Sequence, residues 1–262
     1  MKIDFKWFGG GNWMINVNKI KIICDPVLCP VNSIHDYRIF KSKRINSPYF
    51  SESDLENVDI WLFTHGHMDH CDLANLNPIS NRSIVVSDLS ASKLLEKIQP
   101  DKTRMLRWGE KTEIKIVDTV EIIIEAIPAI HGLNMIKGKL IGNGNGYWID
   151  IIKSNEKYSI YTTGDTLPNR QTVKTLKKRS ANLMIANVGN ATVGNGLLSK
   201  FIGRITMNMS DLKRFRNHIE SDVIIPIHWD AFEHYREKNS LKLCDYNGIK
   251  HVNPGDEIVL EI

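Results

Sequence analysis

A cluster of potential metal ligands follows a short apolar run at residues 60–63, which has the length and character of a buried strand. The ligands are His65, His67, Asp69 and His70. Imidazole and carboxylate groups are ligand types that zinc, iron and manganese accept. Because His65 and His67 are two residues apart, an extended backbone places their rings on the same side. A turn after His67 would bring Asp69 and His70 back to the same point, so the spacing predicts a metal site.

Three further candidate ligands follow other apolar runs. They are His131 after residues 120–127, Asp165 after residues 158–162, and His228 after residues 223–227. Each alone could be a cap or a turn residue, but loops at the carboxyl ends of strands in layered sheets converge on one site. With the first group they make five histidines and two aspartates. Such a set suits two divalent ions about 3.5–4 Å apart that share a bridging carboxylate.

The strands that carry these residues alternate with predicted helices. Strands are expected at 3–7, 13–17, 20–24, 84–86, 103–107, 113–117, 120–127, 147–152, 158–162, 183–188 and 223–227, with a tight hairpin at the glycines 9–11. Helices are expected at 68–76, 88–98, 168–179, 210–218 and 231–238, and a final strand pair at 249–252 and 257–262. No linker rich in proline, glycine or serine divides the chain. Residues 1–262 are therefore expected to form a single domain.

Two long segments, 27–58 and 189–208, show no clear periodicity and are predicted to be loops. Loops of this length are usually functional or mobile, and the first ends just before the ligand group, so it could fold over the site. Its basic residues Lys41, Lys43 and Arg44 could bind an anionic substrate, although a solvated loop is the simpler interpretation. His35 in the same loop could act as an acid or contact the substrate, or it could be solvated.

The composition is that of an ordinary globular chain. Of the 262 residues, 42% are hydrophobic and 24% charged, which allows a substantial core and argues against global disorder. The net charge of +4 is small and scattered, which argues against a nucleic-acid partner. No run approaches the roughly 20 apolar residues of a membrane span, and residues 1–8 lack the core of a signal peptide. A cytoplasmic location is therefore expected, with reduced thiols at Cys24, Cys29, Cys71 and Cys244.

The full ligand pattern resembles that of the metallo-β-lactamase superfamily. That pattern is His-x-His-x-Asp-His, then a single histidine, a bridging aspartate and a late histidine, and every position is filled in this chain. The resemblance implies one metal ion on His65, His67 and His131. It implies a second ion on Asp69, His70 and His228, with Asp165 as the bridge. The implied fold is an α/β, four-layer αβ/βα sandwich, in which two mixed β-sheets are flanked by helices.

Local features resemble one branch of that superfamily, which holds ascorbate-6-phosphate lactonases and N-acyl-phosphatidylethanolamine phospholipase D. These features are Asp25-Pro26-Val27, Thr163-Gly164-Asp165-Thr166 and Pro226-Ile227-His228-Trp229. The branch acts mainly on phosphorylated lactones or phosphodiesters. Asp230 and Ala231 differ from the Gly-Thr that often follows the late histidine in that branch. The residues around His131 lack the Pro-Gly-His-Thr that is common in glyoxalase-type thioesterases, which disfavours a thioester substrate.

The resemblance implies a hydrolase with two divalent ions, zinc being expected and manganese or iron the alternatives. A hydroxide bridging the two ions would form near neutral pH and attack a phosphodiester or a lactone, including a phosphorylated one. Asp69 would bind an ion and could take the proton of the nucleophile. The partner is thus expected to be a small molecule, with an anionic substrate as one option.

Other functions fit the same residues less well. Hydrolysis of another ester, a thioester or an amide is the first alternative. A diiron-type oxidoreductase is the second, but diiron flavoproteins of this fold carry a carboxylate in place of His67 and an added flavin domain. A non-catalytic metal-binding protein is the third, although sites that lose their activity usually lose ligands.

Overall fold

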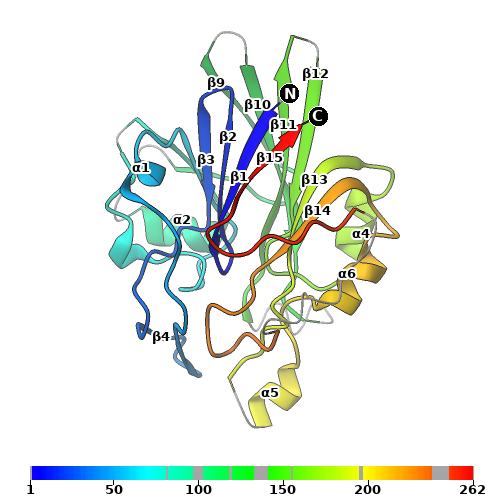
Figure 1. Ribbon diagram of the computed structural model, residues 1–262. Coiled ribbons are helices and arrows are strands. Elements are labelled where there is room, and N and C mark those ends of the chain that lie inside the picture. The colour runs from blue at the N-terminus through cyan, green and yellow to red at the C-terminus, as the bar shows by residue number, and fades with distance from the viewer. Residues whose placement is uncertain are drawn as a thin grey trace.

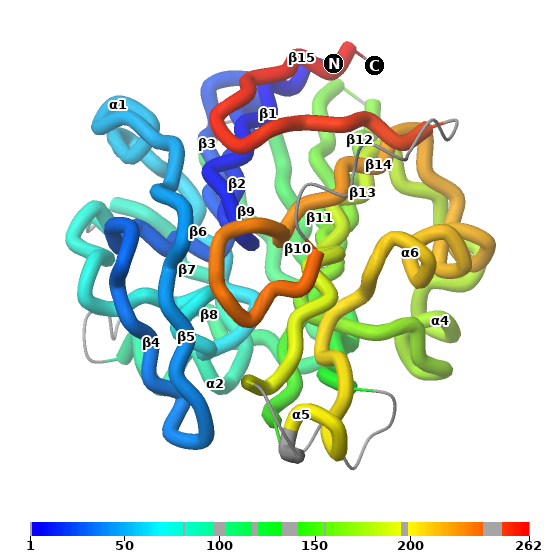
Figure 2. Tube along the Cα trace, turned by 60° about the horizontal axis from the view of Figure 1, so that its bottom comes forward, coloured from blue at the N-terminus to red at the C-terminus, as the bar shows by residue number. Residues whose placement is uncertain are grey.

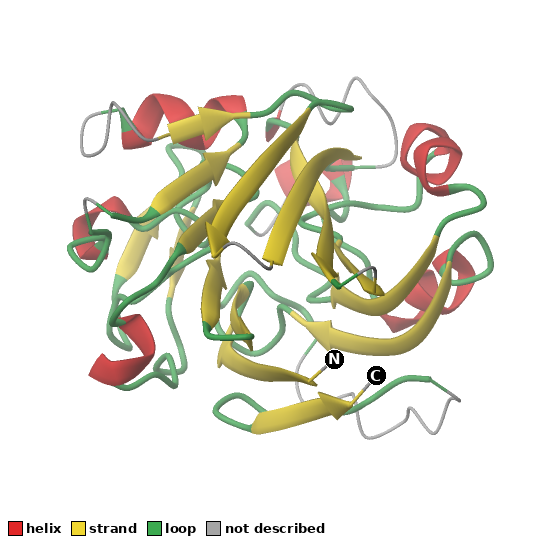
Figure 3. Cartoon of the chain, turned by 90° about the horizontal axis from the view of Figure 1, so that it is seen from above, coloured by secondary structure: helices red, strands yellow, loops and turns green. Residues whose placement is uncertain are grey.

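Two β-sheets pack face to face at the centre of the protein, and helices lie on their outer sides (Figure 1, Figure 3). The computed structural model describes residues 2–80, 82–96, 103–117, 120–132, 141–154, 156–194, 197–237 and 248–261. The core between the sheets contains apolar side chains from both, such as Trp7 and Ile22 of the first and Ile122 and Ile149 of the second. The predicted α/β class, with two mixed sheets flanked by helices, is confirmed.

The first sheet has the strand order β15-β1-β2-β3-β6-β7-β8. Its strands are β1 (Lys2–Gly9), β2 (Asn12–Val17), β3 (Ile20–Cys24), β6 (Ile60–Phe63), β7 (Ile84–Ser87), β8 (Thr103–Met105) and β15 (Glu257–Glu261). In this order, the neighbours from β15 through β1 and β2 to β3 pair antiparallel. The neighbours from β3 through β6 and β7 to β8 pair parallel. Side chains alternate between the faces, so that Ile22 and Cys24 of β3 enter the core between the sheets while Ile23 packs on the outer side. The predicted hairpin at the glycines is the β1–β2 turn.

The second sheet has the strand order β14-β13-β12-β11-β10-β9. Its strands are β9 (Lys111–Val117), β10 (Val120–Ala129), β11 (Gly144–Lys153), β12 (Glu156–Thr162), β13 (Ser180–Asn187) and β14 (Glu220–Ile227). Strands β9 to β12 pair antiparallel, and β12 to β14 pair parallel. Both sheets therefore join an antiparallel half to a parallel half, and the parallel strands run toward the same end of the molecule.

The described helices are short, and all but one flank the two sheets; the exception, at residues 197–202, lies among the loops at one end of the sheets (Figure 1). They are α1 (Glu52–Leu55), α2 (Leu89–Leu95), α4 (Arg170–Leu176), α5 (Leu197–Ile202) and α6 (Met209–Phe215). Side chains of Asp88, Asn169 and Asn208 accept hydrogen bonds from the free backbone N–H groups at the starts of α2, α4 and α6. These caps place the start of α4 two residues after the predicted 168 and the start of α6 one residue before the predicted 210. The predicted ends of two helices, at residues 98 and 238, lie outside the described residues.

The predicted helix at 68–76 is reduced to a single 3-10 turn, η1 (Leu73–Asn75). Asp72 has a non-helical backbone, with φ −91° and ψ 79°. Its Oδ2 accepts hydrogen bonds from the backbone N–H of Cys29 at 3.0 Å and from Nδ2 of Asn75 at 2.7 Å. Because Asp72 is tied to a distant loop, the chain leaves the ligand segment as a turn and not as an α-helix.

Residues 231–237 do not form the predicted helix. Their backbone groups bond to the two long loops: the N–H of Ile45 donates to the carbonyl of Ala231, and the N–H of Arg236 donates to the carbonyl of Gly189. Figure 2 shows this segment in orange, after β14 and beside the strands β4 and β5. The apolar spacing that suggested a helix reflects packing on these loops.

The final segments do not pair with each other as predicted. Ile249 forms a parallel bridge with Ile224 of the second sheet, whereas β15 pairs with β1 of the first sheet. The turn between them is held by the backbone N–H of Gly255, which donates to the carbonyl of Trp7 at 2.7 Å. Residue 262, the predicted end of the last strand, lies outside the described residues.

The two long loops contain regular elements. The first forms an antiparallel hairpin of β4 (Ile34–Asp36) and β5 (Lys41–Lys43), followed by α1. The second contains α5 and an isolated bridge between Thr192 and Arg204. Within the described residues, no helix is both long and apolar enough to cross a membrane.

Candidate metal centre

The structure brings all the predicted ligand side chains together at one end of the two sheets. His65 to His70 follow β6, His131 follows β10, Asp165 follows β12 and His228 follows β14. These residues come from both sheets, and the loops that carry them meet where the carboxyl ends of the parallel strands converge (Figure 1). All except His67 are buried, and His67 is partly exposed.

The first cluster consists of His65, His67 and His131, whose candidate ligand atoms all lie within 4.8 Å of one another. Nε2 of His65 lies 2.9 Å from Nδ1 of His67. The ring of His131 lies beside both at an angle, with centroid distances of 4.7 Å to His65 and 5.0 Å to His67. Three imidazoles therefore face one point, as a tetrahedral ion with an open fourth position requires.

The second cluster consists of Asp69, His70 and His228, with ligand atoms again within 4.8 Å of one another. Nε2 of His70 and Nε2 of His228 are 3.0 Å apart. Oδ2 of Asp69 lies 3.8 Å from the first of these nitrogens and 4.0 Å from the second. This cluster thus offers two imidazoles and one carboxylate.

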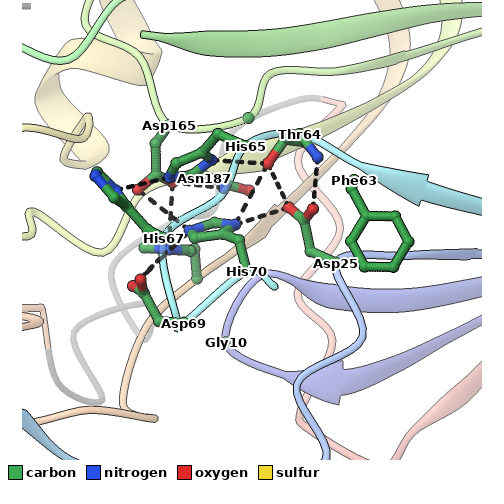
Figure 4. Close-up of polar contacts among 12 residues, drawn as sticks. Gly10, Asp25, Phe63, Thr64, His65, His67, Asp69, His70, Asp165 and Asn187 are labelled. Carbon is green, nitrogen blue, oxygen red and sulfur yellow. Dashed lines mark hydrogen bonds and ion pairs between the residues drawn. The ribbon is translucent and has the colours of Figure 1, made fainter. Parts of the chain in front are cut away.

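Asp165 lies between the two clusters (Figure 4). Its Oδ2 is 3.3 Å from Nε2 of His70 and 3.9 Å from Nε2 of His131, and its Oδ1 is 3.2 Å from Nε2 of His228. Nδ2 of Asn187, at the end of β13, donates a hydrogen bond of 2.8 Å to Oδ1. Asp165 is therefore in the place that a bridging carboxylate would occupy.

Outer partners hold three of the histidines in one tautomer. Nδ1 of His70 donates to Oδ2 of Asp25 at 2.7 Å, and Nε2 of His67 donates to the carbonyl of Ile141 at 3.0 Å. The hydroxyl of Thr64 donates to Asp25 at 2.6 Å, so it accepts from Nδ1 of His65 at 3.0 Å. In each histidine the other ring nitrogen is left with a lone pair that points into the clusters (Figure 4).

Asp25 and Thr64 were not among the sequence-predicted site residues. Asp25 directly follows β3, at the same edge of the sheet as the ligands, and its own backbone N–H donates to the carbonyl of Leu62 at 2.8 Å. The rule that found His131 and His228, a polar residue at the end of an apolar run, also applies to Asp25. That signal was present in the sequence.

The electrostatics favour metal ligation at most of the ligands. Burial alone would raise the pKa of Asp69 and of Asp165, but the facing imidazoles hold both pKa values well below their usual range. Burial lowers the pKa of His131 to about 3 and the pKa of His228 to about 4. Ionised carboxylates and neutral imidazoles are the forms that bind a divalent ion. His70 is the exception: burial alone would lower its pKa, but the neighbouring aspartates hold that pKa well above its usual range, so a metal ion would have to displace its proton.

The histidine contacts provide a test of whether a metal fits. His131 is fully buried, and neither of its ring nitrogens has a hydrogen-bond partner among the described residues. A buried polar group without a partner is costly, and a metal ion would satisfy the nitrogen that faces His65 and His67. The donor set is imidazole and carboxylate, which suits zinc, manganese or iron.

The glycine hairpin between β1 and β2 packs directly against the second cluster. A β-carbon at Gly11 would lie 2.9 Å from Cε1 of His70 and 3.3 Å from Cδ2 of His228. The backbone N–H of His228 donates to the carbonyl of Gly10 at 2.9 Å. The lack of a side chain at Gly11 therefore lets the first sheet approach ligands from both halves of the chain.

A cavity of about 740 Å³ opens beside the clusters. His67, Met68 and Asp69 are among the residues that line it, and most of its lining is apolar. The wall residues include Phe40, Leu73, Leu94, Ile141, Val193 and Ile205. Tyr37 and Phe40 stack at 4.6 Å in the turn between β4 and β5, and the edge of Tyr37 contacts His67. The first long loop thus forms a wall of the cavity, as the sequence suggested.

The predicted basic cluster of that loop, Lys41, Lys43 and Arg44, does not line the cavity. Lys41 pairs with Asp36 at 3.2 Å and Lys43 with Glu233 at 3.7 Å. Arg44 is buried, and its Nη1 donates to the carbonyl of Val27 at 2.9 Å. The cluster therefore does not form an anion site at the cavity, and it does not lie in a fully solvated loop.

His35 is not solvated and does not line the cavity. It is buried, its Nε2 lies 3.4 Å from Sγ of Cys29, and its ring packs on Phe232. Cys24, Cys29 and Cys71 are free thiols, as expected, and Cys244 lies outside the described residues. The direct substrate role considered for His35 therefore has no support from its position.

The site contains two residues that sequence reasoning left unassigned. Oδ2 of Asp69 accepts hydrogen bonds from the hydroxyl of Tyr235 at 3.0 Å and from Nε2 of His234 at 3.2 Å. His234 also lines the cavity. Both lie in the segment that was predicted to be a helix, where neither has a recognisable motif.

A model of the beta-lactamase superfamily domain matches residues 4–228. The chain belongs to the beta-lactamase superfamily. This membership confirms the resemblance that rested on the ligand pattern. The superfamily match runs from β1 to His228 and so includes every predicted ligand, but it ends before His234 and Tyr235.

Relatives within this superfamily have distant sequences. A UPF0173 metal-dependent hydrolase of Pyrococcus abyssi is 26% identical over 212 residues, which are 79% of this chain and 84% of that protein. The N-acyl-phosphatidylethanolamine-hydrolyzing phospholipase D 1 of Caenorhabditis elegans is 26% identical over 169 residues, which are 61% of this chain and 46% of that protein. This chain therefore spans about half of the nematode enzyme.

Solved structures share the superfamily fold. An isothiocyanate hydrolase from Delia radicum gut bacteria superposes on this chain with a TM-score of 0.75 and 21% sequence identity, over 98% of each chain. At that identity the similarity shows the fold alone. It agrees with the two mixed sheets and outer helices described above.

Proposed function

We propose that this chain is a metal-dependent hydrolase that holds two divalent ions. His65, His67 and His131 would bind one ion, and Asp69, His70 and His228 the other. The position of Asp165 carries the proposal, because its two oxygens lie 3.2–3.9 Å from imidazoles of both clusters. A carboxylate in that place can be shared by two ions, which is the arrangement used for two-metal hydrolysis. One core that includes residues of both sheets supports a single domain for residues 1–262.

The ions would supply the nucleophile, because divalent ions lower the pKa of water toward neutrality. The residues of this chain would then orient the reaction. The low pKa of Asp69 makes its carboxylate a weak base but a persistent hydrogen-bond acceptor, so it would align the attacking water. His67, which is partly exposed and lines the cavity, would lie next to the substrate.

The cavity supports a substrate with an apolar body and at most one negative charge. Arg38 is the one arginine or lysine among the described residues that line it, and the aspartates Asp36, Asp69 and Asp72 line it as well. The rest of the lining is largely apolar. A phosphodiester monoanion or an uncharged lactone fits this lining better than a phosphorylated lactone, which carries two charges. Phosphodiesters and lactones are therefore the proposed substrates.

A substrate panel tests the proposal. Purified protein would be loaded with zinc or manganese and assayed on bis-p-nitrophenyl phosphate, an acyl lactone, a phosphorylated lactone, a thioester, nitrocefin and an isothiocyanate. The isothiocyanate is included because of the activity named for the solved neighbour. We expect turnover of the phosphodiester or the lactone, together with two ions per chain by elemental analysis.

The control is the His67→Ala variant, which should bind fewer ions and show no turnover. Turnover of the thioester or of nitrocefin alone would contradict the proposed substrate class. Full activity in protein that contains one ion or none would contradict the two-ion mechanism.

A further inference from the structure

His234 and Tyr235 lie next to the second cluster although they belong to a segment beyond the superfamily match. Both side chains are buried, with exposed fractions of 4% and 0%. Neither residue belongs to the predicted set of metal ligands. Two adjacent polar side chains thus lie at a carboxylate, Asp69, that itself faces two imidazoles.

The two side chains bond the same oxygen of Asp69. Tyr235 donates through its hydroxyl at 3.0 Å and His234 through Nε2 at 3.2 Å, and both bonds end at Oδ2. This is the oxygen that lies 3.8 Å from Nε2 of His70. A carboxylate rotates freely about its bond to the β-carbon unless other contacts hold it, so these two donors fix the direction in which Asp69 presents its oxygens.

The contacts of His234 define a chain of hydrogen bonds with one direction. An ionised Asp69 can only accept, so Nε2 of His234 carries a hydrogen. In the neutral imidazole Nδ1 is then an acceptor, and the hydroxyl of Ser42 donates to it at 2.7 Å. The hydrogen bonds thus run from the donor Ser42 to His234, and from His234 to Asp69. Ser42 is the central residue of β5, so the hairpin that walls the cavity is bonded to a candidate ligand.

Aromatic contacts strengthen the same connection. The rings of Tyr37 and Phe40 both meet the ring of His234 edge-on, with centroids 5.6 Å apart in each pair. These two residues form the turn between β4 and β5 and lie on the cavity. The His234 ring therefore packs against the wall of the cavity while its nitrogens bond Asp69 and Ser42.

The first cluster has different supports. His65 is held by Thr64, and His67 by the carbonyl of Ile141. A change at His234 or Tyr235 should therefore act on the second cluster and leave the first one intact.

We propose that His234 and Tyr235 are positioning residues that hold Asp69 for its metal ion and tie that ion to the β4–β5 hairpin through Ser42. The inference rests on the proposed two-ion function. It predicts that loss of either donor weakens one of the two ions selectively. Partners of ligating groups of this kind typically contribute about 10–100-fold in metal affinity.

The experiment measures the affinity of each metal equivalent by competition with a chromophoric chelator, and the melting temperature of metal-free and metal-loaded protein. The variants are Tyr235→Phe, His234→Ala and His234→Gln. The matched control is Tyr161→Phe, which removes the hydroxyl of another fully buried tyrosine, one without a hydrogen-bond partner among the described residues. Gln at 234 can still offer an N–H near the position of Nε2.

We expect Tyr235→Phe and His234→Ala to weaken one equivalent by about 10–100-fold and to leave the other unchanged. The metal-free melting temperature of Tyr235→Phe should match that of the control, and the increase on loading should be smaller. His234→Gln should recover part of the affinity that His234→Ala loses.

Wild-type affinity for both ions in Tyr235→Phe and His234→Ala would overturn the inference. An equal fall in the stability of metal-free and metal-loaded protein would also overturn it, because the role would then be structural. If His234→Ala does not fold, Tyr235→Phe decides the question, since it keeps the ring. Wild-type protein that binds fewer than two ions would contradict the proposed function itself, which is a separate result.

Discussion

Nδ1 of His70 donates a hydrogen bond of 2.7 Å to Oδ2 of Asp25, and both side chains are buried. The bond leaves Nε2 of His70 free to face Asp165 and His228. Asp25→Asn keeps the shape of the side chain but removes the charge that stabilises this orientation. We expect metal affinity to fall by about 10–100-fold, measured by chelator competition. Asp59→Asn, at a carboxylate that instead bonds the backbone of Lys21, is the control, and unchanged affinity in Asp25→Asn would contradict the role of Asp25.

Removal of the ions should abolish hydrolysis reversibly. Chelator-treated protein is expected to lose all turnover and to regain it when zinc or manganese is added back. His67→Ala and Asp69→Ala should stay inactive after the same addition and hold fewer than two ions per chain by elemental analysis. His218→Ala, an exposed histidine after α6, should behave as wild type. Full turnover in the presence of the chelator would rule out a metal mechanism.

The close approach of Gly11 to His70 makes this glycine sensitive to substitution. A β-carbon would lie 3.1 Å from Nδ1 of His70, which is a tight contact, and 2.9 Å from Cε1, a distance that real β-carbons essentially never show. Gly11→Ala should displace the His70 ring and weaken metal binding at least about tenfold. Gly109→Ala is the control, because a β-carbon there meets open space. That control should lose about 1 kcal/mol of stability through its positive φ but keep both ions. Normal metal affinity in Gly11→Ala would show that the ring can move aside without cost.

Glu125 gives the protein a pH-dependent contribution to stability away from the site. Burial raises its pKa, but the pairs with Arg179 at 2.7 Å and Lys111 at 3.3 Å bring the net pKa below the ordinary value of 4.5. Because the folded-state pKa is the lower one, this stabilisation is present above pH 4.5 and is lost as the pH falls through the folded-state pKa. Glu125→Gln should cost about 1 kcal/mol at neutral pH. The difference from wild type should shrink toward zero in acid.

Urea unfolding of metal-free protein at several pH values measures this difference. Glu113→Gln, on the neighbouring strand β9, replaces an exposed glutamate and should change stability little at any pH. A cost of Glu125→Gln that stayed the same down to low pH would show that packing, and not the ion pairs, is responsible.

Arg38 should distinguish charged from uncharged substrates. It is the one arginine or lysine on the cavity wall within the described part of the chain. Arg38→Ala is expected to raise KM for bis-p-nitrophenyl phosphate by about 2–5-fold at low salt, and less at high salt, because exposed charges are screened. KM for an uncharged lactone should not change. Lys174→Ala, at an exposed lysine of α4 that does not line the cavity, is the control. Equal effects of Arg38→Ala on both substrates would mean that Arg38 shapes the cavity without attracting charge.

The ligand set was predictable because each member is marked locally. His131, Asp165 and His228 are polar residues directly after apolar runs, and the ends of neighbouring strands meet at one edge of a sheet. The same rule would have found Asp25. Strand positions were predicted for a similar reason, since a buried strand such as β6 is an unbroken apolar run.

The walls of the site were not predictable in this way. His234 and Tyr235 lie in a segment whose apolar spacing resembles a helix, yet its backbone bonds to Gly189 and to Ile45. Those partners are distant in sequence, so the periodicity of the segment itself gives no information about them. The helix predicted at 68–76 was wrong for the same reason, because the bond of Asp72 to the backbone of Cys29 prevents the helix that local propensity favours.

Lys2 lies opposite Glu261 in the β1–β15 ladder, at the far end of the sheets from the loops that carry the ligands (Figure 1). The two ends of the described chain are thus held one strand spacing apart. A short peptide could join them, and new ends could be opened at residues 18–19, in the turn between β2 and β3. A surface or a fluorescent protein attached next to Lys2 or Glu261 would leave the cavity facing solution. The fold is therefore suited to circular permutation and to oriented immobilisation.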